Sequence, residues 1–423
     1  MITLANANVF DGRAMLPGRH DVTVDGKRIV SISEHIASSS GEVVDVGGMT
    51  LLPGLISCHL HPDFYKFEIG SGEQPGKELP PGVMMAIGVR TCRVLLESGF
   101  TGYVGASCAH DIDAQLKIAI AQDIIPGPRM RACGHHIGTT GDMNNRPPFW
   151  KVYETPGVDL AADGPDELRK LVRQEIARGV QTIKIFAGAG HGQPNRTTRN
   201  MSRAEIATIV ETAHERGAKV RAHVASRDMI LECIELGVDV IDHGDEIDDA
   251  IIEKMVEAET FWVPSLVYLW SLLEVGYAKR FGVAPELYEH VRTMLPRAQR
   301  AGVRILIGDD YSGVFRTLLA DDPLDHQVGN YGREFGFYAE IDGLSPTDVL
   351  TWGTSNAGQL LVDPPGKVGV IEAGALADLI VIDGDPLADL SLLARPQEAL
   401  KAVMRDGAFV IDRLPPSPAR VAA

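Results

Sequence analysis

The sequence predicts an α/β fold: a distorted (β/α)8 (TIM) barrel with a small β-sandwich domain built from both ends of the chain. Between about residues 54 and 361, short apolar runs alternate with helical segments, which is typical of parallel strands joined by helices. At both ends of the chain, by contrast, the sequence consists mainly of strand-like runs. The 423 residues are enough for one large barrel and a smaller domain.

The barrel is predicted from eight strand-like runs, the number that a closed barrel of this kind needs. They are Leu55–His61, Gly99–Val104, Arg129–Cys133, Thr182–Phe186, Lys219–His223, Val238–Asp242, Phe261–Val263 and Arg304–Ile307. Helix-start signals stand between them: Pro165 begins one helix, Ser202 with Glu205 forms a capping box, and Ser345-Pro346 begins the last. We expect the catalytic barrel domain to cover residues 54–363.

The terminal domain is predicted to combine residues 1–53 with residues 364–423. Asp25-Gly26 and Asp406-Gly407 each separate two alternating runs and indicate hairpin turns. Such an arrangement brings the two chain ends together in space, as domains commonly do.

Composition and charge exclude several classes of protein. A hydrophobic content of 45% and a charged content of 23% are typical of soluble globular proteins, and the net charge of −17 argues against nucleic acid or an anionic membrane as partner. The N-terminal residues lack a basic stretch followed by an apolar one, and no run of about 18 apolar residues occurs, so we expect neither a signal peptide nor a membrane span. The five cysteines are odd in number and without C-x-x-C spacing, which suggests reduced thiols. We expect a cytoplasmic protein, a homo-oligomer, that acts on a small molecule.

Four histidines stand at the ends of predicted barrel strands: His59 and His61 after the first, His223 after the fifth and His243 after the sixth. Because side chains alternate along a strand, His59 and His61 point to the same side. Each histidine alone is as readily explained by a structural role. However, imidazole is the commonest protein ligand of zinc, and barrels of this kind keep their active sites at the carboxyl ends of the strands. Four of the 13 histidines at such positions therefore predict a metal site.

Lys184 lies among apolar neighbours in the fourth predicted strand. A buried lysine is costly unless it is paired or neutralised. From the residues alone, an ion pair with a carboxylate inside the barrel is the simplest explanation.

Three segments resemble motifs of one enzyme family: Val22–Ile32 and Leu52–His61 near the start, and Gly366–Ile382 near the end. They resemble the amidohydrolase superfamily, in the branch of metal-dependent imidazolonepropionase-like hydrolases, Xaa-Pro and Xaa-Arg dipeptidases and the ochratoxin-hydrolysing amidase. The likeness extends over nearly the whole chain.

This resemblance implies a centre of two divalent metal ions. By position in the motifs, the ligands would be His59, His61, Lys184, His223, His243 and Asp310. Lys184 would be carboxylated on its side-chain nitrogen by CO2 and would bridge the two ions, which explains its burial better than an ordinary ion pair. Asp309 stands where the family has threonine, and since alternation turns only one of the two aspartates inward, we expect Asp310 to be the ligand. Zinc is the default metal, although cobalt, manganese or iron also suit these ligands.

The same resemblance implies hydrolysis of a C–N bond in an amide, peptide, carbamate or N-acyl amino acid. Two dications that share a water would generate a hydroxide that attacks the carbonyl, and one of them would polarise that carbonyl. Asp310 would act first as general base and then as general acid. His135 or His136, after the third strand, would polarise the carbonyl; the alternative is that one of them only braces the loop.

The loops after the strands suggest a bulky or aromatic substrate. Their aromatic runs are Phe64-Tyr-Lys-Phe67, Pro147-Pro-Phe-Trp150, Tyr268-Leu-Trp270 and Tyr311, and packing beneath a lid is an equal explanation for them. An arginine in these loops would clamp a substrate carboxylate, although most arginines are simply solvated. The candidates are Arg146, Arg196, Arg199 and Arg227; we expect Arg227, Tyr311, Trp150 and Arg146 to contact the substrate.

Other functions compete with this one. A dipeptidase or carboxypeptidase of the prolidase type is weakened because no tyrosine follows His223, and because the second strand lacks the family's Thr-Thr-Val-Arg-Asp. A cyclic amide (imidazolone-like) hydrolase shares the ligand set and stays open. A deaminase of this fold would generally lack Lys184, and a metal-free scaffold would have lost some of the six ligands, so both rank lower.

Overall fold

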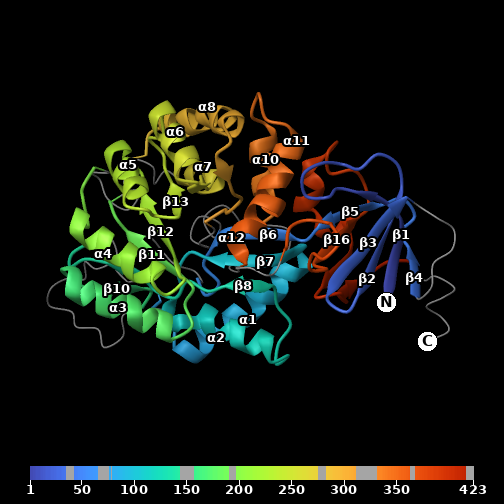
Figure 1. Cartoon of the computed structure of the whole chain (residues 1–423), viewed down its shortest axis with the longest axis horizontal. Coiled ribbons are helices and arrows are strands. Elements are labelled where there is room, and N and C mark those ends of the chain that lie inside the picture. The colour runs from blue at the N-terminus through green and yellow to red at the C-terminus, as the bar shows by residue number, and fades with distance from the viewer. Residues whose placement is uncertain are drawn as a thin grey trace.

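The computed structural model describes residues 1–34, 42–64, 76–77, 79–142, 157–189, 197–274, 283–310, 331–362 and 367–415. In these residues a parallel β-barrel surrounded by helices lies beside a mixed sheet formed by both ends of the chain (Figure 1). The predicted fold class is confirmed.

Eight barrel strands occur where the sequence predicts them, with ends that differ by at most two residues. They are β6 (Leu55–Leu60), β7 (Phe100–Gly105), β8 (Arg129–Arg131), β11 (Thr182–Phe186), β12 (Lys219–Val224), β13 (Val240–His243), β14 (Phe261–Val263) and β15 (Arg304–Ile305). Two short strands were not predicted, β9 (His136–Gly138) and β10 (Asp159–Ala161). β9 follows β8 in the chain and lies between β10 and β11, because it pairs in parallel with both.

Backbone hydrogen bonds outside the regular strand pairs close the barrel. The amide of Thr182 donates to the carbonyl of Ala132 at 3.1 Å, which joins the segment after β8 to β11. On the other side, the amide of Cys58 donates to Ile307 at 2.8 Å and the amide of Asp310 donates to His59 at 3.2 Å. The first and eighth strands are therefore neighbours, and their carboxyl ends meet at one mouth of the barrel.

The helices pack around the barrel, and the three whose starts were predicted begin at those signals. They are α1 (Pro81–Glu97), α2 (Ile112–Ala121), α3 (Pro165–Ala177), α4 (Arg203–His214), α5 (Arg227–Glu235), α6 (Asp249–Glu257), α7 (Leu266–Glu274), α8 (Pro285–Ala301), α10 (Arg333–Ala339), α11 (Pro346–Thr351), α12 (Ala357–Leu361) and, beside the terminal sheet, α13 (Pro396–Ala399). Ser202 and Glu205 form the expected capping box of α4, and Ser345 caps α11. The last predicted helix is interrupted between α11 and α12 by a wide π-helical turn, Trp352–Asn356, which the sequence did not reveal.

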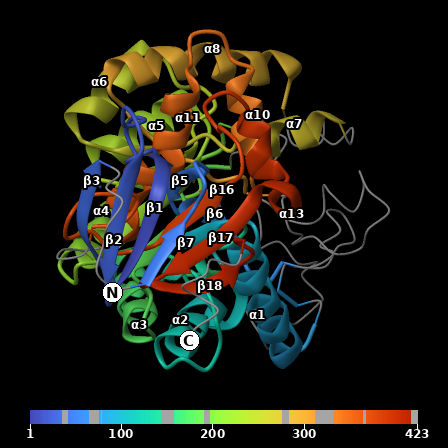
Figure 2. The same ribbon diagram turned by 90° about the vertical axis from the view of Figure 1, so that its right-hand side faces the viewer.

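Both ends of the chain contribute strands to one mixed sheet (Figure 2). These strands are β1 (Ile2–Val9), β2 (His20–Asp25), β3 (Arg28–Glu34), β4 (Glu42–Asp45), β5 (Thr50–Pro53), β16 (Leu379–Ile382), β17 (Leu400–Arg405) and β18 (Ala408–Asp412). The first half of β1 pairs with β2 and β4, its last residues pair with β5, and Asn6 between them has a left-handed φ of 60°. The two parts of the sheet share one apolar core.

A cluster of charged side chains joins this sheet to the barrel. Arg129, at the start of β8, donates to both carboxylate oxygens of Asp378 at 2.9 and 3.2 Å and also pairs with Asp406 in the β17–β18 turn. The hairpin turns predicted at Asp25-Gly26 and Asp406-Gly407 both form. The division into domains at residues 53 and 364 stays a prediction.

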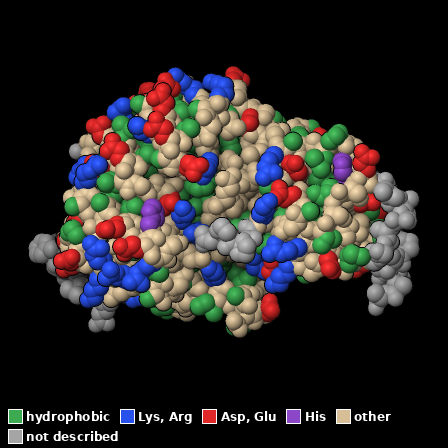
Figure 3. Space-filling view, in the orientation of Figure 1, with side chains coloured by type: hydrophobic (Ala, Val, Ile, Leu, Met, Phe, Trp, Pro, Cys, Tyr) green, Lys and Arg blue, Asp and Glu red, His purple; other side chains and the backbone are tan. Residues whose placement is uncertain are grey.

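The surface carries charges of both signs. On the face seen in Figure 3, acidic and basic side chains are interspersed, and no broad area belongs to one sign. Among the helices that the structure describes, none is both long and apolar enough to cross a membrane. The oligomeric state and the cellular location stay predictions.

Candidate metal centre

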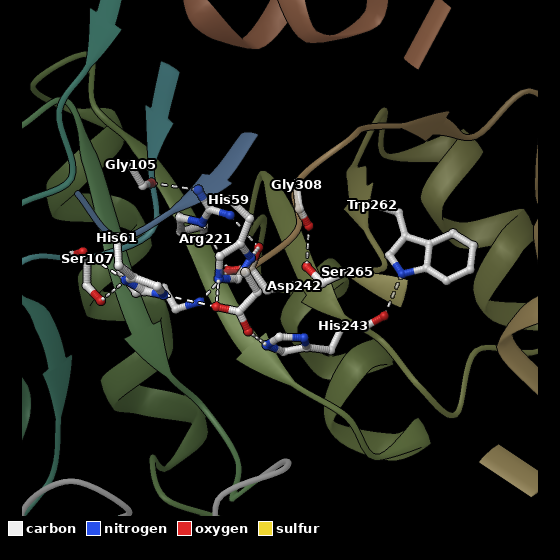
Figure 4. Close-up of polar contacts among 12 residues, drawn as sticks. His59, His61, Gly105, Ser107, Arg221, Asp242, His243, Trp262, Ser265 and Gly308 are labelled. Atoms are coloured by element: carbon white, nitrogen blue, oxygen red, sulfur yellow. Dashed lines mark hydrogen bonds and ion pairs between the residues drawn. The ribbon is translucent and has the colours of Figure 1, made fainter. Parts of the chain in front are cut away.

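Three of the predicted histidines surround the carboxylate of Asp310 at the mouth of the barrel. Oδ1 of Asp310 lies 3.1 Å from Nε2 of His59 and 3.0 Å from Nε2 of His61. Oδ2 lies 3.8 Å from Nε2 of His243. Figure 4 shows the three imidazoles turned towards one another, two from β6 and the residue after it and one from the end of β13. All four residues are buried, so the group is assembled by the fold and not by chance at the surface.

The local backbone explains how these side chains reach one place. A Cβ atom on Gly308 would lie 2.5 Å from the backbone nitrogen of His59, so only glycine lets the eighth strand approach the first this closely. His243 and Asp310 have φ values of 66° and 48°, in the left-handed region that few residues other than glycine adopt. Such backbone strain at element ends is often found at functional sites.

Hydrogen bonding assigns the protons of His61. Its Nδ1 lies 2.9 Å from the carbonyl oxygen of Ser107, which can only accept, so Nδ1 carries the hydrogen. Nε2 lies 3.0 Å from Asp310, and it is the nitrogen whose lone pair the neutral ring would offer to a metal ion. Burial lowers the pKa of His61, which favours this neutral form.

His223 and His136 lie beside this group. The ring of His223 is 4.6 Å from that of His243 and stacks on Phe186 at 4.4 Å. Phe186 also contacts His136, whose backbone lies opposite Lys184 in the β9–β11 pair. Burial, together with the charge of Lys184, holds the pKa of His136 well below its usual range, so its ring is neutral.

Lys184 is buried and paired with a carboxylate that the sequence analysis did not select. Its Nζ donates to Oδ2 of Asp242 at 2.5 Å. Arg221, which is also fully buried, donates to both oxygens of Asp242. Two signals were present in the sequence: Arg221 precedes His223 by two residues and so shares its side of the strand, and a buried arginine requires an acid, which Asp242 supplies.

The four charged groups of the centre balance one another. Lys184 and Arg221 are the cations, and Asp242 and Asp310 are the anions. Burial raises the pKa of Asp242, but the charges of Arg221 and Lys184 outweigh it and hold that pKa well below its usual range. Burial likewise raises the pKa of Asp310, and the adjacent His59 and His61 outweigh it. Burial lowers the pKa of Lys184 and outweighs the negative charge of Asp242, which raises it.

His135 points into a different cluster from that of His136. Its Nδ1 lies 2.9 Å from Asp111 and 3.2 Å from Glu175, and its backbone amide donates to Glu175 at 3.2 Å. Arg178 also pairs with both acids. Of the two histidines considered for the carbonyl, His136 therefore lies by the metal-ligand candidates, and the contacts of His135 are those of a residue that braces its loop.

Stability should fall at alkaline pH because of His135. Burial lowers its pKa, but the hydrogen bonds with Asp111 and Glu175 outweigh burial and raise the pKa to about 9 from 6.5. A histidine whose pKa is raised by folding stabilises the folded state. This stabilisation is complete below pH 6.5 and is lost as the pH rises through 9. Two and a half pKa units correspond to about 3 kcal/mol.

The check is urea unfolding at pH 6 and pH 9.5 of the wild type and of His135→Gln. The wild type should lose about 3 kcal/mol more than the variant over this range. His214→Gln, which changes an exposed histidine bonded to Asp239 at 2.8 Å, is the matched control. Equal pH dependence in the wild type and His135→Gln would contradict the assignment.

Of the predicted substrate contacts, only part lies in the described residues. Phe64 stacks on His61 at 4.3 Å and Tyr268 lies 5.5 Å from His243; both rings are half-buried and flank the cluster. Arg227 is exposed and donates to Asp248 at 2.6 Å, and Arg199 pairs with Glu232. Trp270 packs against Phe337 at 5.1 Å. The remaining residues named in the sequence analysis lie outside the described residues: Tyr65, Phe67, Arg146, Phe149, Trp150, Arg196 and Tyr311.

The donor set fits a divalent metal ion. Ligand atoms of His59, His243 and Asp310 all lie within 4.8 Å of one another. Two ligands bound at about 2.1 Å in a tetrahedron are about 3.4 Å apart. The three distances from Asp310 to the histidines, 3.0 to 3.8 Å, bracket this value.

Comparison with known proteins places the chain in a family. The model of the amidohydrolase family matches residues 50–410. Ochratoxinase from Aspergillus niger is 27% identical over 384 residues, which cover 82% of this chain and 73% of ochratoxinase. A solved amidohydrolase is 28% identical with a TM-score of 0.83, covering 98% of this chain and 100% of its own. A prolidase complexed with N-methylphosphonate-L-proline is 29% identical with a TM-score of 0.82. The match covers 97% of this chain and 99% of the prolidase.

These matches agree with the motifs at both ends of the barrel and with the arrangement of its strands. The chain therefore belongs to the amidohydrolase family, in the branch of ochratoxinase and the prolidase-like proteins.

Proposed function

We propose that this protein hydrolyses the C–N bond of an amide-type substrate at a centre of two divalent metal ions. The observation that carries the proposal is the convergence of His59, His61 and His243 on Asp310, at the separations that ligands of one metal site have. The resemblance to ochratoxinase and to a prolidase supports hydrolysis of an amide bond.

The residues that would hold the ions are His59, His61, Lys184, His223, His243 and Asp310. When bound, the ions supply a water of lowered pKa and polarise the substrate carbonyl. Zinc remains the default metal, and Lys184 would contribute as a carbamate, formed by CO2 on its buried nitrogen.

The protein's own groups then position the substrate and move protons. Asp310 lies between the histidines and stays ionised, so its carboxylate can take a proton from the attacking water and return it to the leaving nitrogen. His136, neutral and next to Lys184, is placed to donate an N–H to the carbonyl oxygen. Phe64 and Tyr268 offer aromatic surface on two sides of the cluster, which favours a bulky or aromatic substrate.

A dipeptidase of the prolidase type is the second candidate. The prolidase with the proline phosphonate covers nearly the whole chain at 29% identity. Arg199 and Arg227, the described arginines that the sequence suggested as carboxylate clamps, instead pair with Glu232 and Asp248. An aryl amide, which needs no carboxylate clamp, is therefore preferred to a dipeptide.

Metal analysis and a substrate screen test the proposal. We expect about two metal ions per chain, loss of activity after dialysis against a chelator, and recovery with zinc. The screen should set N-acyl amino acids and aryl amides against dipeptides, carbamates, lactams and cyclic imides. A protein that holds less than about one ion per chain and keeps its activity in chelator would contradict the binuclear centre; turnover of dipeptides alone would favour the second candidate.

A further inference from the structure

We propose that Asp242, fixed by Arg221, is a positioning residue of the metal centre. It sets the orientation of His59 and the direction in which carboxylated Lys184 presents its oxygens. The inference rests on the proposed function, because it concerns two of the ligands assigned there.

Arg221 holds the Asp242 carboxylate in one orientation. Its Nε donates to Oδ2 at 3.0 Å and its Nη2 to Oδ1 at 2.5 Å, a two-point contact between neighbouring strands. Its Nη1 donates to the carbonyl of Gly105 at 2.6 Å, which anchors the guanidinium to a third strand (Figure 4). Both side chains are fully buried, so a rotation of Asp242 would break charge-assisted hydrogen bonds that water cannot replace.

The first consequence concerns His59. Oδ1 of Asp242 lies 3.1 Å from Nδ1 of His59. An ionised carboxylate can only accept, so when a metal ion occupies the other side of the ring, Asp242 favours the tautomer with the hydrogen on Nδ1 and the lone pair on Nε2. That atom lies 3.1 Å from Asp310, on the side of the metal centre. A carboxylate behind a metal-binding histidine fixes its tautomer and ring orientation in this way.

The second consequence concerns Lys184. Carboxylation converts Lys–NH2 and CO2 into Lys–NH–COO⁻ and a released proton: one N–C bond forms, and the nitrogen keeps one N–H. Because Nζ already lies 2.5 Å from Oδ2 of Asp242, that N–H can remain donated to Asp242. Repulsion between the two anionic groups then turns the new carboxylate away from Asp242. We infer that it is directed towards the other ligands.

Arg221 is needed for both consequences. While Lys184 is unmodified, Asp242 has two cationic partners. Once Lys184 becomes an anion, Arg221 is the cation that remains paired with Asp242 among the described residues. It therefore keeps the Asp242 carboxylate paired and in the same orientation after the modification.

The test is the double variant Arg221→Met with Asp242→Asn, which removes both charges of the pair together. Replacing a buried ion pair by uncharged groups of similar volume is often neutral for stability, whereas removal of one partner leaves an unpaired buried charge. We expect a folded protein whose metal dissociation constant, measured by chelator competition, is raised by roughly ten- to hundredfold. The carbamate resonance in 13C NMR after exchange with labelled bicarbonate should weaken in parallel. If the double variant does not fold, Asp242→Glu, which keeps the charge opposite Arg221 but displaces the carboxylate by one methylene, should give the same two results.

The pair Arg129 and Asp378 provides a matched control, because it is another largely buried two-point ion pair remote from the cluster. Arg129→Met with Asp378→Asn should leave metal affinity and the carbamate resonance unchanged. Wild-type values of both quantities in the Arg221–Asp242 variant would overturn this inference and leave the proposed function standing. A wild-type protein that binds no metal would overturn both.

Discussion

Asp310→Asn is expected to lower kcat by about 10²- to 10⁴-fold, the usual contribution of a positioned acid and base. This equals about 3 to 5 kcal/mol of transition-state stabilisation. The amide keeps an oxygen of similar shape near His59 and His61, but it cannot take a proton from water and pass it to the leaving nitrogen. The measurement is kcat for the best substrate of the screen, with metal content determined on the same samples.

Asp309→Asn is the matched control, because it makes the same chemical change one residue earlier in the same buried segment. We expect a kcat within about tenfold of the wild type, since the carboxylate that lies against the three histidines belongs to Asp310. A large loss in Asp309→Asn with little loss in Asp310→Asn would reverse the assignment of the two aspartates.

Most of the barrel could be predicted because its signals are local. Most of the strands contain a short apolar run. Helices between them begin at caps such as Ser202, which can be identified from four consecutive residues. The end of a strand was less predictable. The sixth strand begins at Val240 instead of Val238, because pairing with the neighbouring strand and not the apolar run decides where the ladder begins.

The candidate ligands could be predicted because position on a strand fixes the side on which a residue lies. This rule fails where the backbone leaves the extended conformation. His243 directly follows Asp242, yet both reach the centre, because His243 has a φ of 66°. No sequence pattern marks a non-glycine residue for that conformation, so the contact of Asp242 with Lys184 and Arg221 was missed.

Contacts between elements that are far apart in the sequence were the second feature that could not be predicted. The sequence places His135 and His136 side by side and cannot say which faces the centre. The answer depends on Asp111 and Glu175, which lie on other elements and draw His135 away. Contacts of this kind depend on the closed barrel as a whole, not on any single segment.

Lys184→Ala is expected to reduce bound metal from about two ions to about one per chain and to lower kcat/KM by more than a hundredfold. A bridging ligand belongs to both coordination spheres, and loss of even an outer partner of a ligand costs roughly ten- to hundredfold. Folding should be retained, because Asp242 keeps Arg221 as its counterion after the lysine is removed. Metal analysis and circular dichroism on the same preparation measure the two quantities.

Two further measurements separate loss of a ligand from loss of packing. Lys219→Ala is the control. It removes a lysine at the start of β12 that pairs with Asp239 at 2.7 Å near the surface, so metal content and activity should stay at wild-type values. In Lys184→Ala, a small carboxylic acid such as acetate can enter the space of the missing side chain and supply the absent carboxylate. Activity that rises with acetate concentration in Lys184→Ala, and not in Asp310→Asn, is the expected result. Full activity and two ions per chain in Lys184→Ala without acetate would show that Lys184 serves only as the buried partner of Asp242.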